Sequence, residues 1–431
     1  MTYPDSVQFL YALGNEMKTA KLGLQRIMQL LASLGHPERA FRVVHVAGTN
    51  GKGSVCAMID SGLRAAGVRT GLFISPHLIE PTERIQIDGM PVSQAQFSKA
   101  FDVVHAAAAA LPFEHPSYFE TITAMAFWLF REAAIETAVV EVGLGGRLDC
   151  TNVVQPVLTV ITSVDMDHEA WLGDTIQLIA AEKAGILKPG VPAVVSAQRR
   201  DVQVVLDARA KELGVRVLRA DDFRATGIEC DARGGRFSGS GLSGLRVPLP
   251  GEHQIGNAIT AVMALRELAV PDAAIEEGLA TTRWPGRLEY ISPNPDVLLD
   301  GAHNPAGAQA LARYLEKHCR PRKIWMIFAA MRDKAAEQVG SILFPLADEL
   351  ILTAPALARA MTPQELAGLA GKLQFPNART AANPIDALQL AAEGASQDDV
   401  IVATGSLYLV GEVRAASYNK NSWPFTGLYS R

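Results

Sequence analysis

The sequence predicts an α/β fold with two units, each built on a mostly parallel sheet, the second smaller than the first. From Phe41 onward, short apolar runs alternate with helical stretches, as in FRVVHVAG, SVCAMIDSGLRAAG and RTGLFIS. The same alternation restarts near Asp296 with DVLLDG, AGAQALARYLEKH and RKIWMIFAAM. Alternating strands and helices are typical of parallel sheets that helices cover on both faces.

At 431 residues the chain is longer than one hydrophobic core usually supports, so we expect two domains. The segment WPGRLEYISPNPD, which is rich in proline and glycine, separates the two alternating regions and has the composition of a linker. We therefore predict a first domain over residues 1–292 and a second over residues 293–431. Ahead of this segment, the glycine-rich stretch DARGGRFSGSGLSGL predicts a β-hairpin or a surface loop.

The composition excludes several classes of protein. Hydrophobic residues make up 48% of the chain and charged residues 20%, which argues against disorder. The net charge is −5 and no long block of lysine and arginine occurs, so we expect no nucleic-acid partner. The four cysteines form no CxxC pair, which favours neither a zinc cluster nor a disulfide framework and fits a reducing cytoplasm. No apolar run is long enough for a membrane span, and we expect neither export nor membrane binding.

A glycine-rich loop lies between the first predicted strand and the first predicted helix, and it reads Gly48-Thr49-Asn50-Gly51-Lys52-Gly53-Ser54. Strand, glycine loop and helix is the context of a phosphate-binding loop. Glycines let backbone N–H groups converge on an anion, the helix N-terminus adds partial positive charge, and Lys52 can neutralise phosphates. The loop only partly matches the common GxxxxGKS pattern. The alternative, a plain glycine turn, leaves Lys52 and Ser54 unexplained.

Candidate metal ligands follow several predicted strands. Glu141 ends the run TAVVEVG, His168 follows VITSV together with Asp165 and Asp167, and Ser75 ends GLFIS. Open α/β sheets bind ligands at the carboxyl ends of their strands. Oxygen ligands with one imidazole beside a triphosphate suit Mg²⁺. Taken singly, Glu141 could be a solvated strand end and His168 an ordinary loop histidine.

Lys183 lies in DTIQLIAAEKAGILKPG, which predicts a helix ended by Lys188-Pro189-Gly190, among apolar neighbours. A partly buried lysine has a lowered pKa and can react with carbon dioxide to give a carbamate, which can bind metal. Spacing alone favours the alternative, an ordinary lysine on a helix face.

Several segments together carry a family resemblance: VVHVAGTNGKGS, LFISPHLIEPTERIQI, SYFETITAMAF, VVEVGLGGRLDCTNVV, SVDMDHEAWLG, IAAEKAGILK, PGEHQIGNAITA, RWPGRLE and DGAHNP. They resemble the bacterial bifunctional dihydrofolate synthase/folylpolyglutamate synthases of the Mur ligase superfamily, and the resemblance covers most of the chain. It implies a P-loop ATPase domain with a mostly parallel sheet and a smaller, Rossmann-like C-terminal α/β domain. The active site would lie in the cleft between them.

The resemblance also implies roles for individual residues. ATP would contact the loop and four distal residues, namely Thr49, Asn50, Gly51, Lys52, Gly53, Ser54, Asn257, Arg287, Asp300 and His303. One or two Mg²⁺ ions would be held by Ser75, Glu141, His168 and a carbamylated Lys183. Lys52, Lys183 and His168 would be the catalytic residues. Arg287 and Asp300 would come from opposite domains, so the complete site would require domain closure.

For the pteroate, the resemblance points to Lys21, Leu22, Gly23, Ser117, Tyr118, Phe119, Glu120, Leu148, Asp149 and Cys150. Phe119 could stack on the flat pterin, and a carboxylate could accept its N–H groups. Many family members read LDATN where this chain reads LDCTN, so the larger Cys150 could alter the fit of the pterin. The residues that bind glutamate are not placed by the resemblance.

The activity that the resemblance implies is an ATP-dependent amide ligation. An acyl phosphate of 7,8-dihydropteroate, or of a reduced folate, would react with L-glutamate in the cytoplasm, on a monomeric enzyme. Three alternatives stay open: folylpolyglutamate synthase activity alone, another Mur-type amino-acid ligase, or a P-loop NTPase that switches partners. The stretch before residue 40 holds no nucleotide-sugar domain, which argues against a peptidoglycan ligase. A non-catalytic folate binder would have no use for Lys52 and Glu141.

Overall fold

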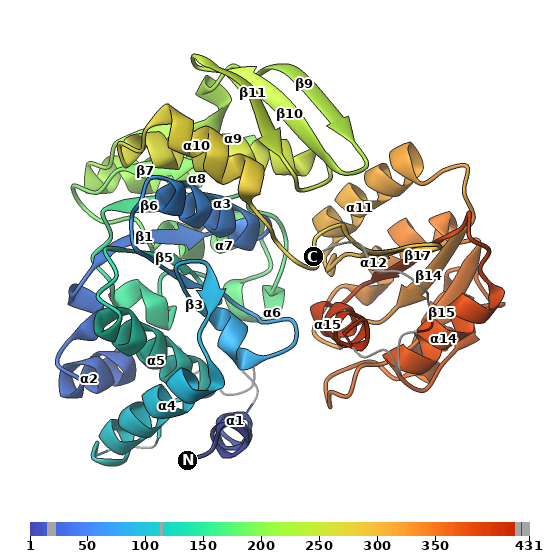
Figure 1. Cartoon of the computed structure of the whole chain (residues 1–431), viewed down its shortest axis with the longest axis horizontal. Helices are drawn as coiled ribbons and strands as arrows, with labels where there is room; N and C mark the ends of the chain where they lie inside the picture. The colour runs from blue at the N-terminus through green and yellow to red at the C-terminus, as the bar shows by residue number, and fades with distance from the viewer. Residues whose placement is uncertain (15–22, 113–114, 419–423, 425–431) are drawn as a thin grey trace.

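The computed structural model describes residues 1–14, 23–112, 115–418 and 424, which form two α/β units side by side (Figure 1). The strands are β1 (Arg42–Ala47), β2 (Thr70–Phe73), β3 (Ile85–Ile87), β4 (Met90–Pro91), β5 (Thr137–Glu141), β6 (Leu158–Ile161), β7 (Ala193–Val195), β8 (Val217–Arg219), β9 (Thr226–Asp231), β10 (Gly234–Gly239), β11 (Leu242–Val247), β12 (Glu289–Pro293), β13 (Asp296–Leu299), β14 (Ile324–Phe328), β15 (Glu349–Leu352), β16 (Arg379–Thr380) and β17 (Val400–Thr404).

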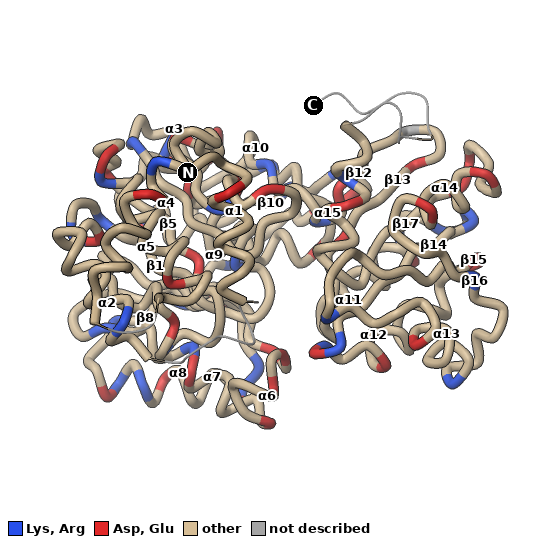
Figure 2. Tube along the Cα trace, turned by 90° about the horizontal axis from the view of Figure 1, so that it is seen from below, with Lys and Arg blue, Asp and Glu red and all other residues tan. Residues whose placement is uncertain are grey.

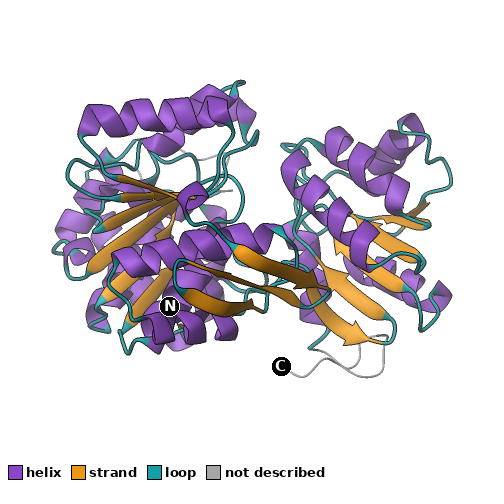
Figure 3. Ribbon diagram, turned by 90° about the horizontal axis from the view of Figure 1, so that it is seen from above, coloured by secondary structure: helices purple, strands orange, loops and turns teal. Residues whose placement is uncertain are grey.

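Helices cover both faces of the two large sheets (Figure 3). They are α1 (Tyr3–Ala12), α2 (Gln25–Ser33), α3 (Lys52–Ala65), α4 (Gln94–Ala109), α5 (Tyr118–Glu132), α6 (Glu169–Leu172), α7 (Ile176–Ala184), α8 (Arg200–Leu213), α9 (His253–Glu267), α10 (Asp272–Thr281), α11 (Pro305–His318), α12 (Ala336–Leu343), α13 (Pro363–Lys372), α14 (Pro384–Gly394) and α15 (Leu407–Ala416). None of the helices in the described part of the chain has the length and apolar character to cross a bilayer.

The first sheet has the strand order β4-β3-β2-β5-β1-β6-β7-β8, and only β3 and β4 run antiparallel to their neighbours. The second has the order β12-β13-β17-β14-β15-β16, with β12 antiparallel. The predicted α/β fold with two mostly parallel sheets is therefore confirmed. β12 spans residue 292, so the second sheet starts a few residues before the domain boundary that the sequence predicts.

The glycine-rich segment forms part of a separate antiparallel sheet, β9-β10-β11, so the prediction of a β-hairpin is confirmed. This sheet extends toward the C-terminal unit (Figures 1 and 3). At its turn, the hydroxyl of Tyr314 in α11 donates to the carbonyl of Ala232 at 2.8 Å. The Arg233 guanidinium lies 4.1 Å from the centre of the Tyr290 ring. The hairpin thus gives the two units a contact besides their linker.

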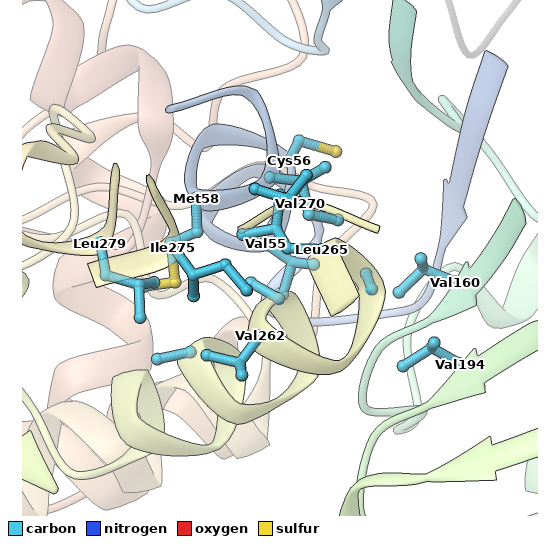
Figure 4. Packing of buried hydrophobic residues seen from close by; sticks show 14 of the residues in the cluster. Val55, Cys56, Met58, Val160, Val194, Val262, Leu265, Val270, Ile275 and Leu279 are labelled. Carbon is cyan, nitrogen blue, oxygen red and sulfur yellow. The ribbon is translucent and has the colours of Figure 1, made fainter. Parts of the chain in front are cut away.

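The helix that follows the phosphate loop is anchored in an apolar cluster. Val55 and Met58 of α3 pack with side chains of α9 and α10, among them Leu265 and Ile275 (Figure 4). Each such side chain contributes about 1.5 to 3 kcal/mol when fully buried. The helices approach so closely that a Cβ atom on Gly278 would lie 2.4 Å from the Cα atom of another glycine, Gly62. This packing fixes the direction of α3 and therefore of the loop before it.

One predicted helix boundary is wrong. The sequence predicted a helix that continues to Lys188, but α7 ends at Ala184. At this point two backbone carbonyl groups accept hydrogen bonds from the loop before β6. Arg147 N donates to Glu182 O at 2.8 Å, and Asn152 Nδ2 donates to Gly185 O at 3.1 Å. Tertiary contacts therefore stop the helix ahead of the proline.

Candidate active site

The phosphate loop connects β1 to α3, and two of its glycines meet steric requirements. Gly48 has φ +153° and lies against β6 and the residue after it, where a Cβ atom would be 1.8 Å from Thr162 Oγ1. Gly51 has φ +84° and precedes α3, and a Cβ atom there would be 2.4 Å from Asn257 Oδ1. No larger side chain fits either place without displacing its neighbour. Lys52 Nζ donates to the carbonyls of Gly48 and Thr49, at 3.1 Å each.

A cavity lies over this loop, and every residue that the sequence analysis assigned to ATP lines it. They are Thr49, Asn50, Gly51, Lys52, Gly53, Ser54, Asn257, Arg287, Asp300 and His303. Arg287 is half-buried, and the charges of two carboxylates, Asp300 and Glu141, act on its guanidinium. Asp300 accepts hydrogen bonds from Leu288 N and Ala302 N, at 3.0 Å each. Residues from both units thus form one concave surface.

The four predicted metal ligands, Ser75, Glu141, His168 and Lys183, line the same cavity. Glu141 ends β5, where Ser75 N donates to its Oε2 atom at 3.0 Å. Burial raises the pKa of Glu141, while the Lys52 charge opposes this shift. The Oε1 atom accepts no hydrogen bond from the residues that the structure describes. The carboxylate therefore has an oxygen available in a cavity that also contains a lysine ammonium.

His168 has a left-handed backbone conformation, with φ 54°, directly before α6. Burial and the Lys334 ammonium lower the pKa of His168 to about 3, so the ring is neutral near pH 7. Its Nδ1 atom is buried and lacks a hydrogen-bond partner among the described residues. A neutral imidazole with an unused nitrogen and a buried carboxylate are suitable metal ligands. In the described part of the chain no group of three or more His, Cys, Asp or Glu side chains is arranged to hold a metal ion, so a cation would need phosphate oxygens or water as further ligands.

Lys183 is buried, with 4% of its surface exposed, and its Nζ atom donates to Gly48 O at 2.7 Å. Burial and the nearby Lys52 charge lower the pKa of Lys183 to about 7. A large fraction of this amine is therefore unprotonated near neutral pH. The lysine faces the phosphate loop rather than solvent, which differs from the ordinary helix-face lysine that spacing alone favoured.

Contacts between the two units close the site on one side, and sequence reasoning missed Asn304 and Lys334, which the C-terminal unit contributes to them. Asn304 Nδ2 donates to Asn50 Oδ1 at 3.0 Å, and Lys334 Nζ donates to Asp167 Oδ1 at 2.6 Å and contacts His168 Nε2 at 3.1 Å. Burial alone would raise the pKa of Asp167, but a hydrogen bond from His303 and the Lys334 charge hold it well below its usual range. Asp167 is thus paired with a lysine. Lys334 follows a strand, so the strand-end rule applied to Glu141 could have indicated it.

A second cavity adjoins the first and contains most of the residues predicted to bind pteroate. Gly23, Ser117, Phe119, Glu120, Leu148, Asp149 and Cys150 line it. Tyr118 does not: its ring is buried, stacks on Tyr11 at 5.9 Å and lies beneath Arg84. Lys21 and Leu22 lie outside the described residues. The two cavities share the lining residues Ser75, Pro76, Gly143, Leu144, His168, His303 and Leu407.

Polar groups in the second cavity are held by local hydrogen bonds. Glu120 caps α5 by accepting from Ser117 N at 2.8 Å and forms an ion pair with Arg26 at 3.1 Å. Burial raises the pKa of the Cys150 thiol well above its usual range, so it stays protonated, and its Sγ atom lies 3.2 Å from Thr123 Oγ1. The Phe119 ring lies so close to Gly143 that a Cβ atom there would be 2.3 Å from the ring.

Comparison with known proteins shows that this chain is a Mur ligase. Residues 46–265 match the Mur ligase middle domain, and residues 286–407 match the Mur ligase, glutamate ligase domain. Within this class the chain belongs to the dihydrofolate synthase/folylpolyglutamate synthase family. It is 35% identical to the Bacillus subtilis protein of that name, over 91% of this chain and 94% of the relative. It is 31% identical to the Escherichia coli protein, over 92% and 91% of the two chains.

Two solved structures share the whole fold. A Mycobacterium tuberculosis folylpolyglutamate synthase complexed with ADP and AMPPCP matches with a TM-score of 0.89 and 35% identity, over 96% of this chain and 99% of that one. An Escherichia coli FolC in complex with DHPP and ADP matches with a TM-score of 0.87 and 30% identity, over 98% and 99% of the two chains. The arrangement of both units is therefore that of an ATP-binding ligase family.

Proposed function

We propose that this protein is an ATP-dependent ligase that joins L-glutamate to the carboxylate of 7,8-dihydropteroate, and to reduced folates to give polyglutamates. The observation that supports this most strongly is the wall shared by the two cavities, which includes His168 and His303. A phosphate donor in one cavity and a carboxylate in the other would meet at this wall, and phosphoryl transfer requires such proximity. The Escherichia coli structure with DHPP and ADP supports the same pairing of ligands here.

The proposed reaction has two steps. The substrate carboxylate attacks the γ-phosphorus of ATP and forms an acyl phosphate, and ADP leaves. The glutamate amine then attacks the acyl carbon, and inorganic phosphate leaves from the tetrahedral intermediate. Lys52 and the loop N–H groups stabilise the negative charge of the transferred phosphoryl group. Positioning and electrostatics supply the rate, and no side chain acts as a covalent nucleophile.

One or two Mg²⁺ ions are part of this proposal. Ser75, Glu141, His168 and a carbamylated Lys183 would hold them, as the available Glu141 oxygen and the unpartnered His168 nitrogen support. When bound, the metal would offset charge on the phosphates. The buried, partly unprotonated Lys183 supports the carbamate, because only a neutral amine adds carbon dioxide.

We further propose a division of labour between residues 1–292, an ATPase domain with the pteroate site to which Asp300 and His303 add ATP contacts, and residues 293–431, the glutamate-ligase domain. Positions of basic and of acidic residues are interspersed along the backbone of both units (Figure 2), which supports small-molecule partners rather than nucleic acid or a membrane. All four cysteines are free thiols, which suits the cytoplasm. We propose that the enzyme acts as a monomer.

A substrate panel tests the proposed function. With ATP and L-glutamate present, we expect turnover with 7,8-dihydropteroate and also with tetrahydrofolate, and mass spectrometry should find the glutamate adducts. Phosphate release should require both the pteroate and the amino acid. Turnover with tetrahydrofolate alone would mean that the protein is only a folylpolyglutamate synthase. Phosphate release without either acceptor would favour an NTPase.

Phe119→Ala is expected to raise the KM for dihydropteroate much more than the KM for ATP. The ring lines only the second cavity, and loss of a stacking partner costs about 0.5 to 1.5 kcal/mol beyond its buried area. Steady-state kinetics with each substrate varied in turn measures the effect. Phe41→Ala is the control, because Phe41 packs against Phe130 and lines neither cavity. Equal increases in both KM values would contradict a stacking role for Phe119.

A further inference from the structure

The C-terminal unit forms one wall of the second cavity. Its residues differ from those of the opposite wall, which is predicted to bind pteroate. The C-terminal wall consists of His303, Met331, Lys334, Arg359, Gly405, Ser406, Leu407 and Tyr408. Two of these side chains, Lys334 and Arg359, are cations. The wall lies at the carboxyl ends of β14, β15 and β17, where open α/β sheets bind ligands. Figure 1 shows α15, which begins at this wall, on the side of the C-terminal unit that faces the larger unit.

The backbone around Arg359 is held rigidly. Arg332 N donates to Arg359 O at 3.0 Å, and Met361 N donates to Ala330 O at 2.9 Å. These bonds belong to a short antiparallel bridge between Met331 and Ala360. The loop after β15 is thereby tied to the loop after β14. The Arg359 side chain therefore starts from a fixed position at the mouth of the cavity, which reduces the entropy lost when it binds a ligand.

The guanidinium of Arg359 retains donors for a ligand. Nη2 donates to the Tyr408 hydroxyl at 2.8 Å, and Nη1 lies 3.2 Å from Asp333 Oδ2. Nε makes no hydrogen bond to the residues that the structure describes. The pair with Asp333 is partly exposed, with side-chain exposures of 18% and 30%, so the guanidinium can still be reached from the cavity that it lines. Guanidinium groups bind carboxylates through two parallel hydrogen bonds.

Tyr408 supports this geometry from the first turn of α15. Its backbone N donates to the side chain of Ser406, the N-cap of that helix, at 3.2 Å. The Arg359 guanidinium lies 5.0 Å from the centre of the Tyr408 ring. The ring and its hydroxyl together hold the guanidinium toward the cavity. Tyr408 is thus a positioning residue for Arg359.

The other cation of this wall is differently placed. Lys334 is paired with Asp167 in a largely buried contact and reaches His168, which belongs to the wall shared by the two cavities. Arg359 and Tyr408 line only the second cavity. Lys334 therefore lies beside the wall that the two cavities share, where phosphoryl transfer is proposed to occur; we call this wall, which includes His168 and His303, the junction. Arg359 lies outside it.

We propose that Arg359 binds the side-chain carboxylate of the incoming glutamate and thereby selects it. This inference rests on the proposed function. The amine that attacks the acyl phosphate must reach the junction at His168 and His303, and the γ-carboxylate is the charged group farthest from that amine. Arg359 lines the same cavity but lies outside the junction, so its positive charge is placed to pair with the γ-carboxylate. The site would discriminate against L-glutamine, which has the same shape without the charge.

The test is an Arg359→Gln variant assayed with ATP, dihydropteroate and L-glutamate, each varied in turn. We expect kcat/KM for glutamate to fall about 100-fold or more, as for the loss of one partner of a hydrogen-bonded charge pair. The KM values for ATP and dihydropteroate should change less than about threefold. The wild-type preference for L-glutamate over L-glutamine should largely disappear. Tyr408→Phe should show the same pattern with a smaller effect.

Arg379→Gln is the matched control, because Arg379 is an exposed arginine of the same unit, in β16, and lines neither cavity. It should keep wild-type kinetics for all three substrates. An unchanged glutamate KM in Arg359→Gln, or an equal loss of affinity for every substrate, overturns the inference. A wild-type enzyme that ligates no glutamate would instead refute the proposed function, so the two failures are distinguishable.

Discussion

A Lys52→Met variant is expected to fold normally and to lose measurable ligase activity. Lys52 is the first residue of α3, and its amine contacts the loop carbonyls of Gly48 and Thr49, where the phosphates of ATP would lie. Methionine keeps the length of the side chain and removes the charge. Loss of one preorganised group that stabilises transition-state charge lowers kcat by about 100-fold or more.

Ligation should be followed by product mass, and folding by circular dichroism and the melting temperature. Lys211→Met, the same change at an exposed position of α8, should have wild-type activity. Because the core around α3 is built from apolar side chains that the substitution leaves intact, the melting temperature of Lys52→Met should stay close to the wild-type value. Near-normal turnover in Lys52→Met would refute the assignment of the phosphate loop.

If Lys183 ligates a metal beside the phosphates, as proposed, Lys183→Ala is expected to be inactive, with a loss of about 100-fold or more. If the lysine acts as a carbamate, formate or acetate should restore part of the activity by supplying a carboxylate in the space that the side chain leaves. In the wild-type protein, ¹³C-labelled bicarbonate should give a carbamate signal by NMR. The reaction adds carbon dioxide to the neutral amine and releases one proton.

Lys188→Ala provides the control for this experiment. Lys188 lies on the same segment and is half-buried, but its Nζ atom donates to Asn152 O at 3.2 Å, away from the phosphate loop. This variant should keep its activity and the carbamate signal. Full activity of Lys183→Ala would exclude a role as metal ligand. Inactivity with neither rescue nor a carbamate signal would show that the amine acts only by holding the Gly48 carbonyl.

Local patterns predicted the sheets and the glycine loop between β1 and α3 well, because strand, glycine loop and helix are encoded by neighbouring residues. They failed where a distant segment decides the structure. α7 ends at Ala184 because a loop some thirty residues earlier competes for its carbonyls, and no feature of the helix itself shows this. The pairing of Asn50 with Asn304 joins residues 254 positions apart, and no spacing rule predicts which side chains meet across a cleft.

The prediction for Tyr118 failed because adjacent residues of one motif were given the same role. The motif SYFE was assigned to the substrate as a block, but successive residues of a helix point about 100° apart, at 3.6 residues per turn. Phe119 therefore lines the cavity while the Tyr118 ring is buried against Tyr11. Arg359 was missed for another reason, since a single arginine in a loop has no sequence signature until the strands β14 and β15 are placed side by side.

The contacts of Asn50 with Asn304 and of Asp167 with Lys334 have a consequence for biosynthesis. Domains generally fold as units, the N-terminal one first, as the chain leaves the ribosome. A nascent chain that has completed the first sheet already carries its phosphate loop, but Asp300, His303 and Lys334 are not yet made. Such a chain lacks the groups that complete the cavity over the nucleotide. If these groups are required for turnover, as proposed, catalytic competence is acquired only after the C-terminal unit has been made.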